Sequence, residues 1–198
     1  SVEDLVEEVG HCEALGLPFL VMHPGAHDGA GVEQGLQSII RALDTVHQRT
    51  PGYRARILLE TTAGQGTALG GRFEELAALM GGVRAPERLG VCVDTCHVFA
   101  AGYDLRTREA YETTMRELAR TVGLERVQAF HLNDAVGALG DHLDRHAEIG
   151  EGQLGLDAFR WLINDRRWRE CPMVLEIEQS PDAHEVVENL GRLRALGK

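Results

Sequence analysis

Short, nearly continuous apolar runs alternate along the chain with longer segments in which apolar residues recur every three or four positions. The first pattern is typical of strands buried on both faces, and the second of helices with one buried face. We therefore predict strands at residues 18–23, 56–60, 90–94, 127–131 and 173–176. Helices are predicted at residues 2–15, 32–49, 73–80, 108–122, 156–165 and 183–196. Because no Pro- or Ser-rich linker interrupts this alternation, residues 1–198 are predicted to form one domain.

Each predicted strand ends in a polar residue of a type that binds metal ions, namely His23, Glu60, Asp94, His131 and Glu176. Open, doubly wound α/β sheets usually bind their ligand at a single switch point in the strand order. A closed (β/α)8 barrel instead brings the C-terminal ends of all its strands to one site. We therefore predict an α/β fold of the TIM (β/α)8-barrel type. Because such barrels run to about 250 residues and eight strands, we expect an N-terminally truncated barrel of about five βα units.

The strand ends and the segments after them contain eight imidazole and carboxylate groups: His23, Glu60, Asp94, His97, His131, Asp144, His146 and Glu176. Any one of them alone is often a structural histidine, a helix cap or half of an ion pair. Five such strand ends in succession are harder to explain, because each buried, unpaired ionisable group costs several kcal/mol. Nitrogen and oxygen ligands without thiolates suit zinc or manganese, and eight of them exceed the needs of one tetrahedral ion. The pattern predicts two or three ions, which in phosphoesterases clamp the attacking and leaving oxygens.

Other polar residues give weaker signals. Asp144 and His146 lie in a polar loop, but residues two apart in an extended segment project the same way. Gly64 and Gly66 are predicted to be turn residues, because their glycine-rich segment lacks the Lys-Ser/Thr of a P-loop. The remaining histidines fit no constellation and are predicted to be solvated: His11, His27, His47, His142 and His184. The cysteines have neither disulfide-framework nor zinc-knuckle spacing and are predicted to be reduced, buried thiols.

The formal net charge of −11 argues against indiscriminate binding to nucleic acid, since Lys and Arg normally neutralise the phosphates. Bound divalent cations would offset part of this charge, and acidic residues on distal helices would leave one face free to meet DNA. No segment approaches about 20 consecutive apolar residues, and the N-terminal segment resembles no signal peptide. We therefore expect a cytoplasmic protein that does not bind membranes, and the sequence indicates no protein partner.

Six segments carry a family resemblance: HPG, ETTAGQG, VDTCHVFAAGYD, FHLND, DRHAEIGEG and VLEIE. In their order and spacing they resemble the endonuclease IV family of apurinic/apyrimidinic endonucleases, over essentially the whole chain. The resemblance implies a TIM barrel that binds three zinc ions. It also implies hydrolysis of the phosphodiester 5′ of an abasic site in double-stranded DNA during base excision repair, which leaves a 3′-hydroxyl.

The same motifs imply a role for each candidate residue. Glu60 would bridge two ions as a catalytic carboxylate, with His23 on the first ion. The second ion would be held by Asp94, His131 and Glu176, the last of these also counted as catalytic. The third ion would be held by His97, Asp144 and His146. Arg145 would contact a substrate phosphate or orient a neighbouring carboxylate, and no role is assigned to Glu178.

The resemblance is incomplete at one end. In the family, strands that precede the HPG strand supply a further histidine ligand and loop residues that penetrate DNA, and these segments are not in this sequence. We therefore expect the chain to bind fewer ions and to cut DNA poorly or not at all. Two alternatives stay open. One is a truncated zinc-binding barrel fragment with little or no activity alone, or half of an assembly completed by another chain. The other is a metal-dependent sugar isomerase or epimerase, whose site needs one or two ions.

Overall fold

The computed structural model of the 198-residue chain describes residues 1–177 and 180–197, so Glu178 lies outside the described residues. Its helices are α1 (Val2–Leu15), α2 (Val32–Arg49), α3 (Phe73–Gly82), α4 (Thr95–Ala100), α5 (Arg108–Thr121), α6 (Leu156–Ile163) and α7 (His184–Leu196). The strands are β1 (Phe19–Met22), β2 (Gly25–Ala26), β3 (Arg56–Glu60), β4 (Ala68–Leu69), β5 (Leu89–Asp94), β6 (Val127–His131), β7 (Asp134–Ala135), β8 (His146–Ala147) and β9 (Met173–Val174). Short 3-10 helices occur at η1 (Pro86–Arg88), η2 (Leu124–Arg126) and η3 (Arg166–Trp168).

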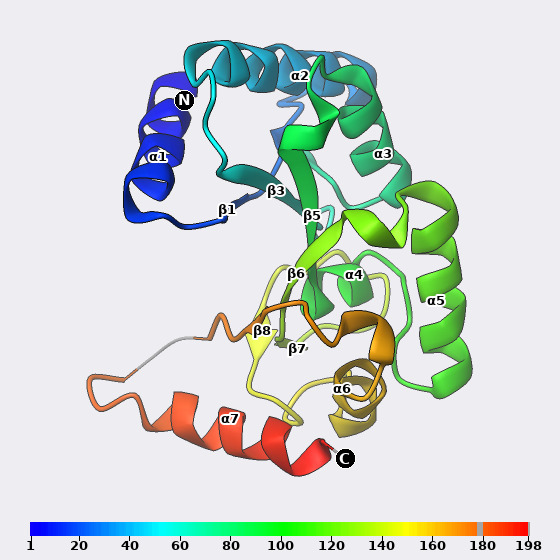
Figure 1. The fold of residues 1–198 in the computed structure, drawn as a ribbon. Coiled ribbons are helices and arrows are strands. Elements are labelled where there is room, and N and C mark those ends of the chain that lie inside the picture. The colour runs from blue at the N-terminus through cyan, green and yellow to red at the C-terminus, as the bar shows by residue number, and fades with distance from the viewer. Residues whose placement is uncertain (178–179, 198) are drawn as a thin grey trace.

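Five parallel strands form the main sheet in the order β1-β3-β5-β6-β9. Each strand pairs with the one before it, so that Met22 lies beside Leu59 and Asp94 lies beside His131. Helices α2, α3 and α5 connect successive strands and follow one another along one side of the sheet (Figure 1). This order is that of a TIM-type barrel wall, and it confirms the predicted α/β class with about five βα units.

The main core lies between the sheet and the helices. Its fully buried side chains include Leu43 of α2, Leu76 of α3, Tyr111 of α5, Phe130 of β6 and Phe159 of α6. The helices also contact one another in sequence: α1 contacts α2, α2 contacts α3, α3 contacts α5, α5 contacts α6, and α6 contacts α7 (Figure 1). Burial of this apolar surface is the dominant force that holds the helices in place and thereby fixes the positions of the strand ends.

The opposite, inner face of the sheet carries a smaller apolar cluster, formed by Leu58, Cys92 and Ala129. Side chains two positions apart on a strand point to the same face. The residues two positions after these three are Glu60, Asp94 and His131. Strand alternation therefore directs three of the predicted metal ligands toward one side of the sheet, at the end where the strands finish.

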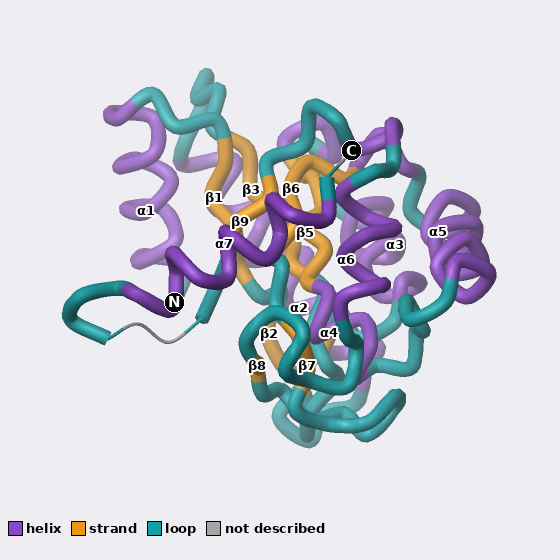
Figure 2. Tube along the Cα trace, turned by 90° about the horizontal axis from the view of Figure 1, so that it is seen from below, coloured by secondary structure: helices purple, strands orange, loops and turns teal. Residues whose placement is uncertain are grey.

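Three small features at this end are absent from the sequence-based prediction: the antiparallel pair β2–β4, the antiparallel pair β7–β8, and helix α4. Helix α4, β7 and β8 gather where β5 and β6 end, as Figures 1 and 2 show. His146 therefore lies on a strand, β8, and not in a loop. Two predicted strand-end residues also lie beyond their strands, because β1 stops at Met22 and β9 at Val174.

The prediction that His47 is solvated is wrong, because its side chain lies on the apolar face of α2 with Leu43 and Val46 and is only 8% exposed. Neither of its ring nitrogens has a hydrogen-bond partner in the described part of the chain.

All four cysteines are free thiols, three of them buried and Cys171 partly so. Among the described residues, no helix combines the length and the apolar character that crossing a bilayer requires.

Candidate metal centre

Glu60, the last residue of β3, lies at the centre of a polar cluster and is 4% exposed. Its Oε1 atom lies 2.8 Å from Nδ1 of His131 and 3.5 Å from Nδ1 of His97. Its Oε2 atom lies 3.5 Å from Nε2 of His23. The two oxygens of one carboxylate thus face different histidines, as a carboxylate shared between two cations would require.

On one side of this carboxylate, four residues offer ligand atoms that all lie within 4.8 Å of one another: Glu60, Asp94, His131 and Glu176. Nδ1 of His131 is 3.1 Å from Oε2 of Glu176 and 3.9 Å from Oδ2 of Asp94. Asp94 is fully buried, whereas the Glu176 side chain is about half exposed. This group matches the set that the sequence motifs imply for the second ion, and one of its members faces solvent.

A second group forms around His97, on the first turn of α4. Its Nε2 atom lies 3.0 Å from Oδ1 of Asp144 and 3.2 Å from Nε2 of His146. His146 and Asp144 are 3.8 Å apart between Nε2 and Oδ1. These three residues are the set implied for the third ion, and the pairing of β7 with β8 carries His146 toward α4. Nδ1 of His97 also approaches Glu60, which joins His23, Glu60 and His97 into a further group.

The buried carboxylates of this cluster have no arginine or lysine partner within the described part of the chain. The groups within 4 Å of Glu60 and Asp94 that could carry positive charge are all histidines. Burying carboxylates is costly unless a positive charge compensates them. Either protonated imidazoles or bound cations can supply that charge, so the donor set fits a cluster of divalent metal ions with nitrogen and oxygen ligands.

The electrostatics of the cluster favour the charged forms of Glu60 and His97, whereas burial raises the pKa of Asp94. Burial by itself would raise the pKa of Glu60, but hydrogen bonds with His131 and His97 outweigh it and lower this pKa to about 2. Burial by itself would lower the pKa of His97, but Asp144 and Glu60 raise it to about 11. Without cations, His97 therefore holds a proton at neutral pH, and a metal ion that binds its nitrogen must displace that proton.

Comparison with known proteins identifies the relatives of this chain. The family model described as a xylose isomerase-like TIM barrel matches residues 1–196. The probable endonuclease 4 of Chloroflexus aurantiacus is 51% identical over 196 residues, which cover 99% of this chain and 69% of that protein. This chain belongs to the endonuclease 4 family. The probable endonuclease 4 of Geobacter sulfurreducens is 47% identical over 96% of this chain and 64% of its own length.

Solved structures agree with membership of the endonuclease 4 family. Endonuclease IV from Thermus thermophilus superimposes with a TM-score of 0.82 at 36% identity, over 99% of this chain and 67% of that chain. A D-tagatose 3-epimerase-like protein has a TM-score of 0.72 at 19% identity, over 98% of this chain. That second likeness reflects the shared fold alone.

Asn133 is a residue of the site that the sequence reasoning missed. It is fully buried, its Nδ2 donates to Oδ2 of Asp94 at 2.5 Å, and its Oδ1 accepts from the backbone N–H of Glu176 at 3.0 Å. One side chain thus connects two members of the four-residue group. Its place directly after His131 and Leu132, in the FHLND motif, is the signal that could have revealed it.

The loop that carries Asp144 is attached to the loop after Glu60. The backbone N–H of Asp144 donates to Oε1 of Gln65 at 2.8 Å, and a ring nitrogen of His142 lies 2.8 Å from the carbonyl oxygen of Ala63. His142, predicted to be solvated, is exposed but makes this specific contact. Gly64 has φ +69°, a left-handed conformation that suits the predicted turn. These contacts hold Asp144 beside His97.

In the sequence Arg145 lies between Asp144 and His146, two members of the His97 group. The structure holds this residue through its backbone. Its carbonyl oxygen accepts from the backbone N–H of Val136 at 3.0 Å and from the Cys96 thiol at 3.5 Å. The residue is exposed, and its guanidinium forms no ion pair with a described residue. The side chain is therefore free to bind a ligand that approaches the cluster from solvent.

Proposed function

We propose that this chain is a zinc-dependent endonuclease of DNA repair, which hydrolyses the phosphodiester 5′ of an abasic site in double-stranded DNA and leaves a 3′-hydroxyl. The observation that carries the proposal is the position of Glu60, whose two oxygens face His131 on one side and His23 on the other. A carboxylate placed in this way could serve two metal ions, and two-metal sites stabilise the attacking and leaving oxygens in phosphodiester hydrolysis. Membership of the endonuclease 4 family supports the same reaction.

In this proposal three sets of residues would hold metal ions. Glu60 and His23 would hold the first ion, and Glu60 would also serve the second ion together with Asp94, His131 and Glu176. The third ion would be held by His97, Asp144 and His146. When bound, the zinc ions supply Lewis acidity, which makes water a better nucleophile at neutral pH and offsets the negative charge of the phosphate.

The side chains themselves perform further tasks. Buried Glu60 provides a fixed negative charge, so that this part of the cluster does not have to rearrange during the reaction. Exposed Glu176 and His23 line the open side, where the phosphate has to enter. Arg145, beside Asp144 and His146, is suited to hold a substrate phosphate by paired N–H donors.

The proposal is tested with a fluorescent duplex that contains one abasic site, incubated with zinc-loaded protein. We expect a nick, formed at a low rate, on the 5′ side of the site, and a 3′ end that a DNA polymerase extends without further processing. Glu60→Gln keeps the size of the side chain but removes its charge, and should reduce the nicking rate at least about a thousandfold, because both ions lose a shared ligand. Glu7→Gln, on the exposed surface of α1, is the matched control and should behave as the unaltered protein.

Nicking that persists in Glu60→Gln, or 3′ ends that the polymerase cannot extend, would overturn the assignment. A second candidate is a zinc-binding barrel fragment with little activity of its own. It is favoured by the group of His23, Glu60 and His97. His23 is 48% exposed, and the other two members also belong to other ligand groups, so the first ion has few ligands of its own. Zinc binding without any nicking, followed by activity when a preceding segment of a relative is added, would select that candidate.

A further inference from the structure

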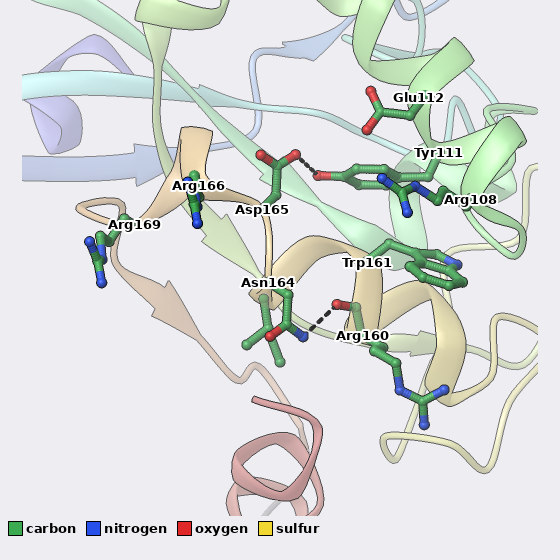
Figure 3. Close-up of a pocket in the computed structure, with 10 residues that line it drawn as sticks. Arg108, Tyr111, Glu112, Arg160, Trp161, Asn164, Asp165, Arg166 and Arg169 are labelled. Carbon is green, nitrogen blue, oxygen red and sulfur yellow. Dashed lines mark hydrogen bonds between the residues drawn. The ribbon is translucent and has the colours of Figure 1, made fainter. Parts of the chain in front are cut away.

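A hollow of about 700 Å³ lies on the helical side of the molecule, away from the metal centre. It is bordered by α5, the end of α6 and the residues of η3, and none of the eight predicted metal ligands lines it. Figure 3 shows the side chains around it, with Arg166 and Arg169 on one side and Arg108 and Trp161 on the other. Its volume falls within the range of about 300–1,000 Å³ that is usual for small-molecule sites.

Three arginines of this hollow have no partner in the described part of the chain. Arg108, Arg166 and Arg169 are exposed, and no ion pair or side-chain hydrogen bond with a described residue is formed by any of them. They come from two separate segments, the start of α5 and the η3 region. In a protein with a net charge of −11, three unpaired guanidiniums around one hollow are a marked local excess of positive charge.

The carboxylates of the hollow do not neutralise these arginines, because other groups already engage them. Asp165 accepts from Arg167 Nε at 2.7 Å and from the Tyr111 hydroxyl at 2.8 Å. Glu112 accepts from Arg167 Nη2 at 3.0 Å. The Tyr111 hydroxyl is itself fixed by a hydrogen bond from the indole of Trp168 at 2.9 Å. The carboxylates in the wall of the hollow are thus paired with Arg167 and Tyr111. The three exposed arginines are therefore free to bind an external anion.

We propose that this hollow is a phosphate-binding site. Guanidinium groups bind phosphoryl oxygens through paired, charge-assisted hydrogen bonds, and arginine is the residue best suited to do so. The partly buried ring of Trp161 adds an apolar surface against which a nucleobase or a sugar can pack. The phosphate can belong to a free nucleotide or to the backbone of DNA, and the experiment below separates these sources.

The two tryptophans of the chain make the test specific to this site. Trp161 lines the hollow, and the Trp168 indole donates a hydrogen bond to Tyr111 in its wall, so their indole N–H signals in an NMR spectrum report on the hollow. Zinc-free protein is titrated with inorganic phosphate, with deoxyadenosine monophosphate, and with an undamaged duplex of about 20 base pairs. We expect saturable shifts of at least one indole signal with one or more of these probes.

Variants then identify the residues responsible. The double variant Arg166→Ala/Arg169→Ala should weaken binding at least about tenfold, since a hydrogen bond to a charged group is lost at each position. Arg108→Ala should weaken binding as well, whereas Arg120→Ala, an exposed arginine on the same helix, should leave it unchanged. Binding of the monophosphate would identify a nucleotide site, and binding of the duplex alone would identify a contact with the DNA backbone.

The absence of saturable indole shifts with all three probes would overturn the proposal. Shifts of the same size and affinity in the double variant would also overturn it, because the arginines would then play no part. Since the zinc-free protein is used throughout, failure of this proposal is distinguishable from failure of the proposed nuclease activity.

Discussion

Replacement of Asn133 by leucine removes the side chain that connects Asp94 with the backbone of Glu176. The Asn133→Leu variant keeps nearly the same volume but loses a hydrogen bond to a carboxylate, worth about 1.5–3 kcal/mol, and a neutral one worth about 1 kcal/mol. We therefore expect the free energy of unfolding of the zinc-free protein to fall by about 3 kcal/mol. Zinc affinity should fall about 10- to 100-fold, which is the usual result of removing a group that orients a metal ligand.

Urea unfolding measures the first quantity, and competition with a chromophoric chelator measures the second. Asn133→Asp separates the two bonds, because it keeps an acceptor for the Glu176 N–H but places a second carboxylate against Asp94. Gln37→Leu, at an exposed position of α2, controls for the introduction of a leucine. If Asn133→Leu unfolds within about 0.5 kcal/mol of the unaltered protein and binds zinc equally well, Asn133 does not position the site.

Two further predictions concern protons. Because the pKa of His97 is raised to about 11 in the metal-free cluster, zinc binding at pH 7 should release at least about one proton per chain. Calorimetry in buffers of different ionisation enthalpy checks this, and a binding enthalpy that does not depend on the buffer would contradict it. Burial, followed by the charge of Arg88, holds the pKa of His47 below its ordinary value of 6.5. The unfolded chain therefore binds a proton on His47 at higher pH than the folded chain does, so stability is lost as pH falls below about 6.5. His47→Leu should reduce the loss between pH 6.5 and 5.5 by up to about 1 kcal/mol, and equal losses in the two proteins would refute this role.

Regular elements were predictable because their patterns are long enough to show a period. The bounds of α1, α2, β3 and β6 agree with the prediction residue for residue. Helix α4 was missed because its six residues are all buried, so no polar face reveals a helical period. The pairs β2–β4 and β7–β8 were missed because two residues a strand carry no alternation at all.

The candidate site shows the same limits. The order of the motifs was sufficient to identify the eight imidazole and carboxylate groups as candidate ligands. It did not show that α4 places His97 next to Glu60. His47 was placed in solvent because histidine is polar, although its position four residues after Leu43 puts it on the apolar face of α2. The arginines of the hollow come from separate segments, so only the packing of α5 against α6 shows that they border the same hollow.

The proposed reaction requires cations at the point where Glu60, His97 and His131 converge. Crystals of this chain grown with zinc, measured at X-ray energies on both sides of the zinc absorption edge, test this directly. We predict anomalous peaks within about 2.0–2.3 Å of the ligand atoms, with one of them shared by Glu60, Asp94, His131 and Glu176. A crystal with full zinc supply and no anomalous peak among these residues would contradict the metal centre, and with it the proposed reaction.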